Sequence, residues 1–494
     1  SRGSAWVKQN PTLVRLASIS ATDVTSESRL LTWRASWEGW VENPARLLFG
    51  YGQENYYAVF NAHFPSRVFR DLGSQIWFDR AHNIVFDIGV TSGLVGLLAY
   101  AAIFGLAGRV LWLQLRRHGD FVTAAAFGGA LVGYVVQNLF VFDTLNTHLP
   151  FFIIIGFLAA LERDLQLGWW QRLLARLPHR ALAAPVSAGL VTAAVVLTAL
   201  SIYSLNVKVL QATHEIFLAL RANDNGYRRE RIEHLQRAIA GGATGRNEAR
   251  QQLATYVAGL QRDPRVPPED LQRLVRLAVE ELRAGVREDP TNVRNHLFLA
   301  SVANRLAAVD RGYAQEVLDV LAVAERLSPT RPQIYFEKAQ AYFALNQPDE
   351  AIRQMQRGLA LSPDVVESHL DVAIAYLVTG QPEQARAHVA EVRDRLRYRL
   401  LLRDYDRLAM VAERMGDYDL IVELTLEQVA AQPSEPKLQI ALAQAYAWQG
   451  KNPEAAAAAQ AVLKLAPNDA QLKEQVERFL ADLKAGKLRR PPAT

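Results

Sequence analysis

The chain has 494 residues, enough for more than one domain, and its 55 Lys and Arg against 50 Asp and Glu give a net charge of +5. It contains no cysteine, which excludes disulfides, thiolate metal sites and cysteine nucleophiles. The net positive charge comes with no aromatic-rich basic motif of the kind that binds nucleic acid.

The first predicted element is a helix in an aromatic-rich polar segment. Within residues 28–40 (SRLLTWRASWEGW), Trp33, Trp37 and Trp40 follow a spacing of i, i+4 and i+7, which predicts an amphipathic helix with the three rings on one face. Arg29 lies on that face, four residues before Trp33. We expect the tryptophan stripe to build a small core rather than a platform for sugars.

Two further pieces follow before the chain becomes apolar. Residues 43–52 (NPARLLFGYG) contain Gly50 and Gly52, which predict a tight turn rather than a phosphate cradle, because no strand precedes them and no helix follows in the required order. Residues 79–98 begin with Asp-Arg-Ala-His-Asn and run directly into a hydrophobic helix. His82 is therefore expected at the mouth of a helix bundle.

Four uncharged runs of 18 to 27 residues divide the chain into two polar parts. A helix of about 20 apolar residues spans the hydrocarbon core of a bilayer. Four such runs in succession favour a transmembrane bundle over a large soluble all-α core. The predicted spans are residues 88–108, 121–142, 144–161 and 181–207.

The basic residues of the short loops predict one orientation. Lys and Arg gather on the cytoplasmic side of a membrane, and here they follow the first and third spans but are missing from residues 143–148. The loops concerned carry Arg109, Arg116 and Arg117, and then Arg163, Arg172, Arg176 and Arg180. Residues 1–83 and everything after residue 208 are therefore expected on the extracytoplasmic side.

The C-terminal part repeats itself with a period of 34 residues. Pro329 and Pro363, Tyr342 and Tyr376, and Gly416 and Gly450 share that spacing. A 34-residue helix–turn–helix pattern with a closing proline resembles the tetratricopeptide repeat, which builds a solenoid with a concave face. We expect Gly380 and Gly450 at the turn between paired helices, and at least four repeats between about residues 290 and 480.

The expected fold is all-α: a polytopic transmembrane bundle of four spans followed by an α-solenoid of tetratricopeptide repeats. The expected domains are an extracytoplasmic loop (1–83), transmembrane helices (84–207), irregular helical repeats (208–289), the tetratricopeptide repeat domain (290–486) and a disordered tail (487–494).

The ordered set of Ser-Arg…Trp, a Pro…Gly-x-Gly turn and Ala-His-Asn before a glycine-bearing apolar helix resembles the O-antigen ligase and O-antigen polymerase superfamily over about residues 25–165. The resemblance implies a periplasmic loop and transfer of a glycan from an undecaprenyl-diphosphate carrier to a lipid or glycan acceptor, with inversion and without a metal or other cofactor. Family members carry further helices before this loop, so we expect an upstream part to complete the enzyme and to contribute a family arginine that has no counterpart here.

The resemblance also assigns roles within the loop. His82 takes the role of general base or acceptor-orienting group, and Arg29 that of diphosphate binding; Arg grips phosphate with a planar fork, and His is the usual base near neutral pH. Asn83 is expected to orient the histidine. Further phosphate or glycan contacts are expected from Arg80, Arg70, Arg67 and Arg34. Read without the resemblance, His82 is an interfacial polar residue and Arg29 caps a helix or pairs with Glu27.

Two classes of function stay open. The first is a glycosyltransferase of the cell envelope, in the inner membrane of a bacterium, whose repeats bind a protein partner in polysaccharide or lipopolysaccharide assembly. The second is a non-enzymatic scaffold anchored in the membrane, with the repeats recruiting envelope proteins. A transporter subunit is disfavoured because the spans carry no ionisable residue at mid-depth. The sequence does not choose among ligase, polymerase and protein O-glycosyltransferase, and it names neither sugar nor acceptor.

Overall fold

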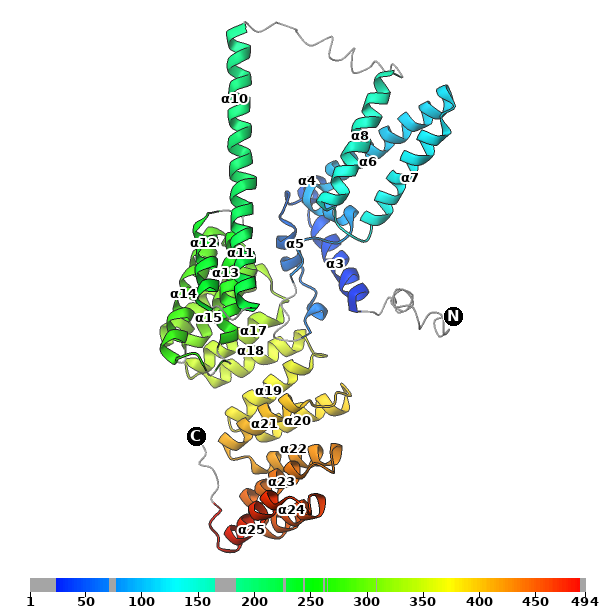
Figure 1. The fold of residues 1–494 in the computed structure, drawn as a ribbon. Helices are drawn as coiled ribbons and strands as arrows, with labels where there is room; N and C mark the ends of the chain where they lie inside the picture. The colour runs from blue at the N-terminus through cyan, green and yellow to red at the C-terminus, as the bar shows by residue number, and fades with distance from the viewer. Residues whose placement is uncertain are drawn as a thin grey trace. The chain divides into compact units, whose positions relative to one another are not determined.

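The computed structural model describes residues 24–70, 77–164, 184–224, 228–242, 245–260, 263, 265–307 and 309–488, and within them all regular secondary structure is helical (Figure 1). The chain divides into two compact units, one ending at Leu345 and the other formed mainly by residues 346–494. The all-α prediction is confirmed. The ends of the chain, including residues 489–494 of the expected tail, lie outside the described residues, as do Arg172, Arg176 and Arg180.

The N-terminal loop is a group of short helices: α3 (Val24–Trp40), α4 (Pro44–Phe49), α5 (Tyr56–Ala62) and the 3-10 turn η1 (Ser66–Val68). The helix expected at residues 28–40 lies within α3. Helix α4 starts where it does because Asn43 caps it, its side-chain oxygen accepting from the backbone N–H of Arg46 at 3.0 Å.

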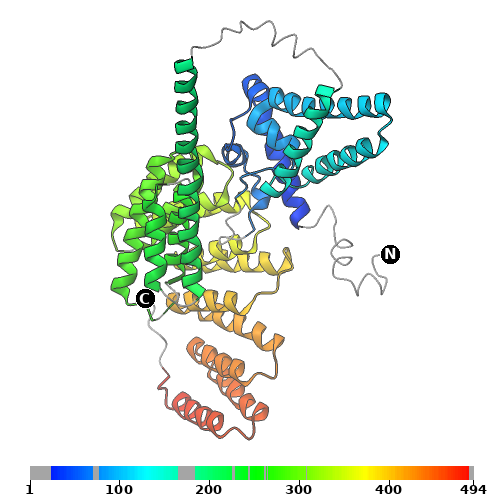
Figure 2. The same ribbon diagram turned by 45° about the horizontal axis from the view of Figure 1, so that its top comes forward.

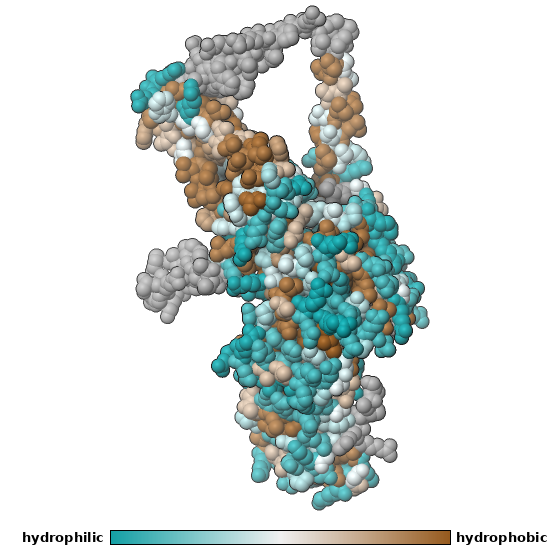
Figure 3. Space-filling view, turned by 180° about the vertical axis from the view of Figure 1, so that it is seen from behind, coloured by the Kyte–Doolittle hydropathy of each residue, from teal (hydrophilic) through white to brown (hydrophobic). Residues whose placement is uncertain are grey.

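The apolar runs form the next helices. These are α6 (Ile84–His118), α7 (Phe121–Asn138), α8 (Leu145–Asp164) and α10 (Ala184–Ile202), the last continuing through a π-helical turn (Tyr203–Val207) into α11 (Lys208–Asp224). Three of them are long and apolar enough to cross a membrane: Ile84–His118, Phe121–Asn138 and Ala188–Ala222. The third expected span, residues 144–161, forms only a shorter apolar helix, Leu145–Leu161, so three of the four expected spans have the length of a membrane helix. Figure 3 shows apolar side chains gathered over these helices and mostly hydrophilic ones over the rest of the chain that it draws in colour.

Helices α6, α7 and α8 pack as a small bundle. Buried side chains from all three meet in one cluster that includes Leu111, Leu131, Phe151 and Leu158. The rings of Tyr134 on α7 and Phe151 on α8 stack with their centres 4.5 Å apart. The start of α6 is joined to the end of α7 by a hydrogen bond from Asn83 to the carbonyl of Leu139, and the candidate site lies there.

Helix α6 is broken at Gly93, and the loop fills the break. Gly93 has a φ of 66°, and a Cβ there would lie 2.2 Å from the carbonyl oxygen of Leu48. The backbone N–H groups of Tyr51 and Gly52 donate to the carbonyls of Val90 and Thr91, each at 2.8 Å. The glycine turn predicted at residues 50–52 is confirmed, and its N–H groups bond to α6 rather than standing open for a phosphate.

A helical array follows α11 in the same unit: α12 (Arg228–Ala240), α13 (Arg246–Leu260), α14 (Pro268–Glu288), α15 (Val293–Ala307), α16 (Arg311–Leu327) and α17 (Pro332–Ala344). Successive helices lie side by side (Figures 1 and 2) and share one continuous apolar core, to which Leu253, Leu282 and Leu299 contribute. Trp77 of the N-terminal loop packs against this core.

The second unit repeats the same pattern: α18 (Pro348–Leu361), α19 (Val366–Val378), α20 (Pro382–Asp394), α21 (Leu402–Met415), α22 (Tyr418–Ala431), α23 (Pro436–Gln449), α24 (Asn452–Leu465) and α25 (Ala470–Lys484). The turns between paired helices hold Gly380, Gly416 and Gly450 with φ of 72°, 74° and 87°. Only glycine adopts such angles without strain, so the prediction of turn glycines at positions 380 and 450 is confirmed. Asn346, 34 residues before Gly380, takes φ of 61° in the equivalent turn.

Candidate functional site

The tryptophans of α3 join the loop to the start of α6. The indole nitrogen of Trp33 donates to the carbonyl of Ala81 at 2.9 Å, and its ring stacks on Phe86 with centres 5.9 Å apart. Trp40 is buried and donates to the carbonyl of Leu47 at 3.1 Å. These two rings build the loop core, as expected, while Trp37 is 54% exposed.

The residues before and after His82, Ala81 and Asn83, are both fixed by hydrogen bonds. The N–H of Ala81 donates to the Asp87 carboxylate at 2.5 Å. His82 itself has a φ of 56°, which is uncommon for a side chain with a Cβ and costs about 1 kcal/mol. Such a conformation persists because its neighbours are fixed, so the imidazole is presented in one direction.

Asn83 fixes the other side. Its side-chain oxygen caps α6 by accepting from the N–H groups of Val85 and Phe86 at 2.9 and 3.3 Å. Its side-chain nitrogen donates to the carbonyl of Leu139 at the end of α7, at 3.0 Å. The amide is therefore engaged with the backbone, and it orients His82 through the peptide chain rather than by contact with the ring.

The His82 ring is half-buried between two aromatic rings. Phe78 and Phe142 approach it edge to face, with centres 5.8 and 5.1 Å away. Its Nδ1 lies 3.2 Å from the carbonyl oxygen of Arg80. Because a carbonyl only accepts, Nδ1 carries the proton in this arrangement, and Nε2 keeps a lone pair that can take a proton from a hydroxyl.

Arg80 lies beside Phe142, one of the two rings that flank His82. Its guanidinium is 6.0 Å from the centre of Phe142 and pairs with Glu54 at 2.8 Å. The Glu54 side chain is 78% exposed. Exposed pairs of this kind are weak, so a diphosphate can displace the carboxylate. We call Phe78, Arg80, His82 and Phe142 the His82 cluster.

The carboxylate of Asp143, the residue after Phe142, is engaged by neighbouring side chains. Its carboxylate accepts from the Tyr134 hydroxyl at 2.8 Å and from the Asn138 amide at 2.9 Å, and it lies 3.2 Å from Nε2 of His148. The side chain is only 10% exposed. It holds the turn between α7 and α8, and so keeps Phe142 against His82.

Arg29 lies one helical turn, about 5.4 Å, before Trp33 on the face of α3 that meets the start of α6. Within the described part of the chain, no side chain forms a hydrogen bond or ion pair with its guanidinium. The carboxylate of Glu27, which sequence reasoning offered as a partner, pairs with Arg67 at 3.1 Å instead.

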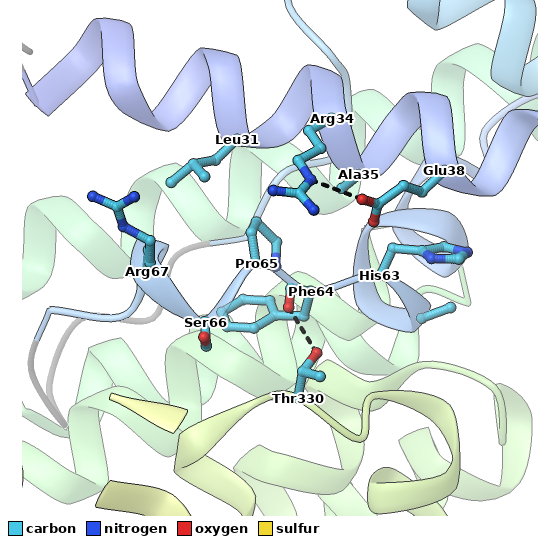
Figure 4. A pocket seen from close by; sticks show the side chains of 11 residues that line it. Leu31, Arg34, Ala35, Glu38, His63, Phe64, Pro65, Ser66, Arg67 and Thr330 are labelled. Carbon is cyan, nitrogen blue, oxygen red and sulfur yellow. Dashed lines mark hydrogen bonds and ion pairs between the residues drawn. The ribbon is translucent and has the colours of Figure 1, made fainter. Parts of the chain in front are cut away.

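Arg34 and Arg67 lie elsewhere, in a pocket of about 350 Å³ between α3, the end of α5 and Thr330 (Figure 4). Arg34 pairs with Glu38 at 2.8 Å, and His63 lies on the same rim. The pocket mixes both charges, which suits hydroxyl-rich sugars better than a diphosphate. Arg70 is exposed just before residues outside the described part, and the structure places it in neither group.

Tyr51 and Tyr56 also lie in the loop, and sequence reasoning gave neither a role in the site. The Tyr56 hydroxyl lies 2.6 Å from that of Ser36, and burial raises its pKa well above the ordinary value. Burial, with a hydrogen bond to Glu42, raises the pKa of Tyr51 to about 12. Both phenols stay protonated near neutral pH, so neither is expected to act as a base in this loop.

Comparison with protein families adds two matches. Residues 4–101 match the family model described as O-Antigen ligase, and residues 336–397 match the tetratricopeptide repeat. The first covers the loop and the first half of α6, including His82. Among curated proteins, no match is found.

Solved structures similar to the chain are helical-repeat proteins. MamA from Desulfovibrio magneticus RS-1 is 16% identical over 38% of this chain and 95% of its own, with a TM-score of 0.30. A tetratricopeptide repeat protein from Parabacteroides merdae ATCC 43184 is 18% identical over 49% and 91%, with a TM-score of 0.31. A thermophilic tetratricopeptide repeat protein of Thermus thermophilus is 17% identical over 55% and 99%, with a TM-score of 0.24.

Proposed function

We propose that this chain, a membrane protein of the O-antigen ligase family with C-terminal tetratricopeptide repeats, is a glycosyltransferase that takes a glycan from an undecaprenyl-diphosphate carrier and joins it to a lipid or glycan acceptor. The observation that carries the proposal is the His82 ring, which has a left-handed backbone conformation and packs against Phe142, the ring that Arg80 also approaches; no described residue hydrogen-bonds to its Nε2. A base and a phosphate-binding group thus stand together at the mouth of a membrane helix.

The residues present suit a single displacement at the anomeric carbon. The acceptor oxygen forms the new glycosidic bond while its proton passes to Nε2 of His82, and the bond to the diphosphate breaks with its electron pair on the leaving oxygen. Negative charge grows on the diphosphate, and arginine forks are the groups that bind it best. Arg29 and Arg80 take this role, Asn83 holds the backbone, and Arg34, Arg67 and Arg70 contact the glycan.

We place this chemistry on the extracytoplasmic side of the bacterial inner membrane. The basic loops support that orientation. Contact of Thr330 and Arg331 in the helical array with Phe64 and Asn61 in the loop supports one side for both, because two segments that bond to each other share a compartment.

A non-enzymatic scaffold is the second candidate, and the tetratricopeptide match at residues 336–397 favours it. Such repeats stack into surfaces that bind other proteins. The two candidates differ in what a change at His82 does: an enzyme loses glycan transfer, whereas a scaffold is indifferent there.

The test is complementation of a strain that lacks its own ligase, using the full-length gene. Wild type is expected to transfer glycan to the lipid acceptor, and His82→Ala is expected to lose it while inserting normally. Arg353→Gln is the matched control, since Arg353 pairs with Glu350 on its own helix. Normal glycan transfer by a His82→Ala variant that inserts correctly would contradict the role proposed for that residue. If wild type transfers no glycan to the lipid acceptor, polymerase activity, protein glycosylation or a scaffold role is favoured over ligase activity.

A further inference from the structure

One arginine of the helical array is buried against the loop and, among the described residues, forms no ion pair with a carboxylate. Arg331, at the turn between α16 and α17, is 1% exposed. Its guanidinium lies 3.9 Å from the ring centre of Phe64 and 4.1 Å from that of Trp77, and it donates to the side-chain oxygen of Asn61 at 2.8 Å. Burial lowers its pKa to about 9. Attraction to two aromatic faces offsets part of this cost of burial.

The neighbouring residue strengthens the same junction. Thr330 donates from its hydroxyl to the carbonyl of Phe64 at 2.7 Å, as Figure 4 shows. A cation beside two rings and two hydrogen bonds thus join the turn before α17 to the last turn of α5 and the segment that follows it. These contacts hold the array against the loop, and they also restrict the orientation of the Phe64 ring.

From Phe64 a continuous row of rings leads to His82. Phe64 meets Phe60 with centres 5.5 Å apart, and Phe60 meets Phe78 at 5.1 Å. Phe78 then meets His82 at 5.8 Å. All three contacts are edge to face, a preferred geometry for aromatic pairs. Phe60 and Phe64 are 1% and 4% exposed, so neither ring can turn without moving the next.

The start of the row is braced by α3. Tyr56, one turn before Phe60 on α5, is buried, and its hydroxyl lies 2.6 Å from that of Ser36. The end is braced by Phe142, 5.1 Å from His82 on its other side. The imidazole is therefore set between a row that begins at Arg331 and a ring held by the α7–α8 turn.

We propose that Arg331 is a positioning residue for glycan transfer, and that the helical array sets the orientation of the His82 ring through Phe64, Phe60 and Phe78. This rests on the proposed function, in which His82 is the base. It makes the array a part of the reacting site rather than only a place where partners dock.

The test uses the full-length protein in lipid nanodiscs and measures kcat and KM for the lipid-linked donor. Arg331→Ala is expected to lower kcat by about tenfold, since displacement of a reacting group by a fraction of an ångström has effects of this order. The KM for the donor is expected to stay within about twofold, because Arg331 does not touch the donor. Arg331→Lys keeps a cation between the rings and is expected to recover most of kcat.

The matched control is Arg283→Gln. Arg283 joins α14 to α16 by two bonds to Glu316, and so stabilises the same array without touching the loop. It is expected to leave kcat unchanged. Phe60→Leu interrupts the row without altering the array and is expected to lower kcat as Arg331→Ala does. Combined with Arg331→Ala, it adds little further loss if both act along one row.

Equal kcat in Arg331→Ala and Arg283→Gln overturns the proposal, as does a Phe60→Leu variant with wild-type kcat. If Arg331→Ala does not accumulate in the membrane, kcat is compared for Phe60→Leu and Arg331→Lys instead. A wild-type kcat for Phe60→Leu would again overturn the proposal. His82→Ala separates this inference from the proposed function. If His82→Ala transfers normally, the site itself is wrong; if His82→Ala is inactive while Phe60→Leu is normal, only the role of Arg331 fails.

Discussion

Arginine has different partners in the helical array and in the N-terminal loop. In the array, Arg250 is only 4% exposed and reaches Glu288 at 2.7 and 3.0 Å, and Glu281 at 3.4 Å. The loop contrasts with this: Arg34 is 76% exposed and pairs with Glu38 one turn along its own helix. Arg29 has no hydrogen-bonding side chain within the described residues.

This difference in partners indicates which arginines can bind a ligand. A guanidinium whose fork is filled by carboxylates of neighbouring helices holds those helices together, and to release it would leave buried charges unpaired. A guanidinium paired only at the surface gives up its partner at little cost. The loop, though it has fewer arginines than the array, holds those that an anionic ligand can use.

Among the arginines, the largest effect is expected at Arg29. Arg29→Ala should lower glycan transfer by about 100-fold, the usual loss when a group that stabilises developing charge is removed. Arg34→Ala should change it by less than about threefold, because an exposed pair contributes little. Initial rates with a lipid-linked donor in membranes of the two variants measure this. Equal losses would show that the loop does not divide its arginines in this way.

A change at Arg250 should act on stability instead. Arg250→Gln breaks the pairs with Glu281 and Glu288 and is expected to destabilise the array by about 2 kcal/mol, which lowers its Tm by about 5 °C. Arg353→Gln, which removes an exposed pair within α18, should stay within about 0.5 kcal/mol. Thermal unfolding of the full-length protein followed by circular dichroism gives both values. A Tm unchanged by Arg250→Gln would contradict the structural role.

The smallest expected effect is a loss of stability of the array at low pH. The hydrogen bond from Arg250 is the main cause that lowers the pKa of Glu288, to about 2 from its ordinary 4.5. A lowered folded pKa means that the pair stabilises the array fully above about pH 4.5, and that this contribution is lost as the pH falls towards 2. Glu288 is 43% exposed, so screening reduces the contribution to about 1 kcal/mol.

The control for this pH dependence is Glu288→Gln, which cannot titrate. Between pH 7 and pH 3 its Tm should fall by less than that of wild type. Parallel curves for the two proteins would show that Glu288 does not contribute to the acid sensitivity.

Much of the fold could be predicted because it depends on patterns within short stretches of the sequence. Apolar length predicts the membrane helices, and a 34-residue period predicts the positions of Gly380 and Gly450. The break of α6 could not be predicted. It depends on the close approach of Leu48 to Gly93 and on bonds from Tyr51 and Gly52, and a glycine inside an apolar run does not show which backbone approaches it.

The candidate site was predictable only in part, and the roles of its residues stay predictions. The motif Ala-His-Asn pointed to His82, but its partners Phe78 and Phe142 come from both sides along the chain. Arg331 was missed altogether. It bonds to Asn61 across 270 residues, and an arginine before a proline in a repeat looks like any other surface charge. Contacts between distant segments follow from tertiary packing and leave no periodic signal.

The most direct test of the account is single-turnover transfer by the full-length protein in lipid nanodiscs, with the undecaprenyl-diphosphate-linked donor bound beforehand and its binding measured separately. For His82→Ala we predict donor binding within about threefold of wild type and transfer at least about 100-fold slower, the loss expected when a general base is removed. Transfer by His82→Ala at the wild-type rate would contradict the central claim that this histidine takes the acceptor proton.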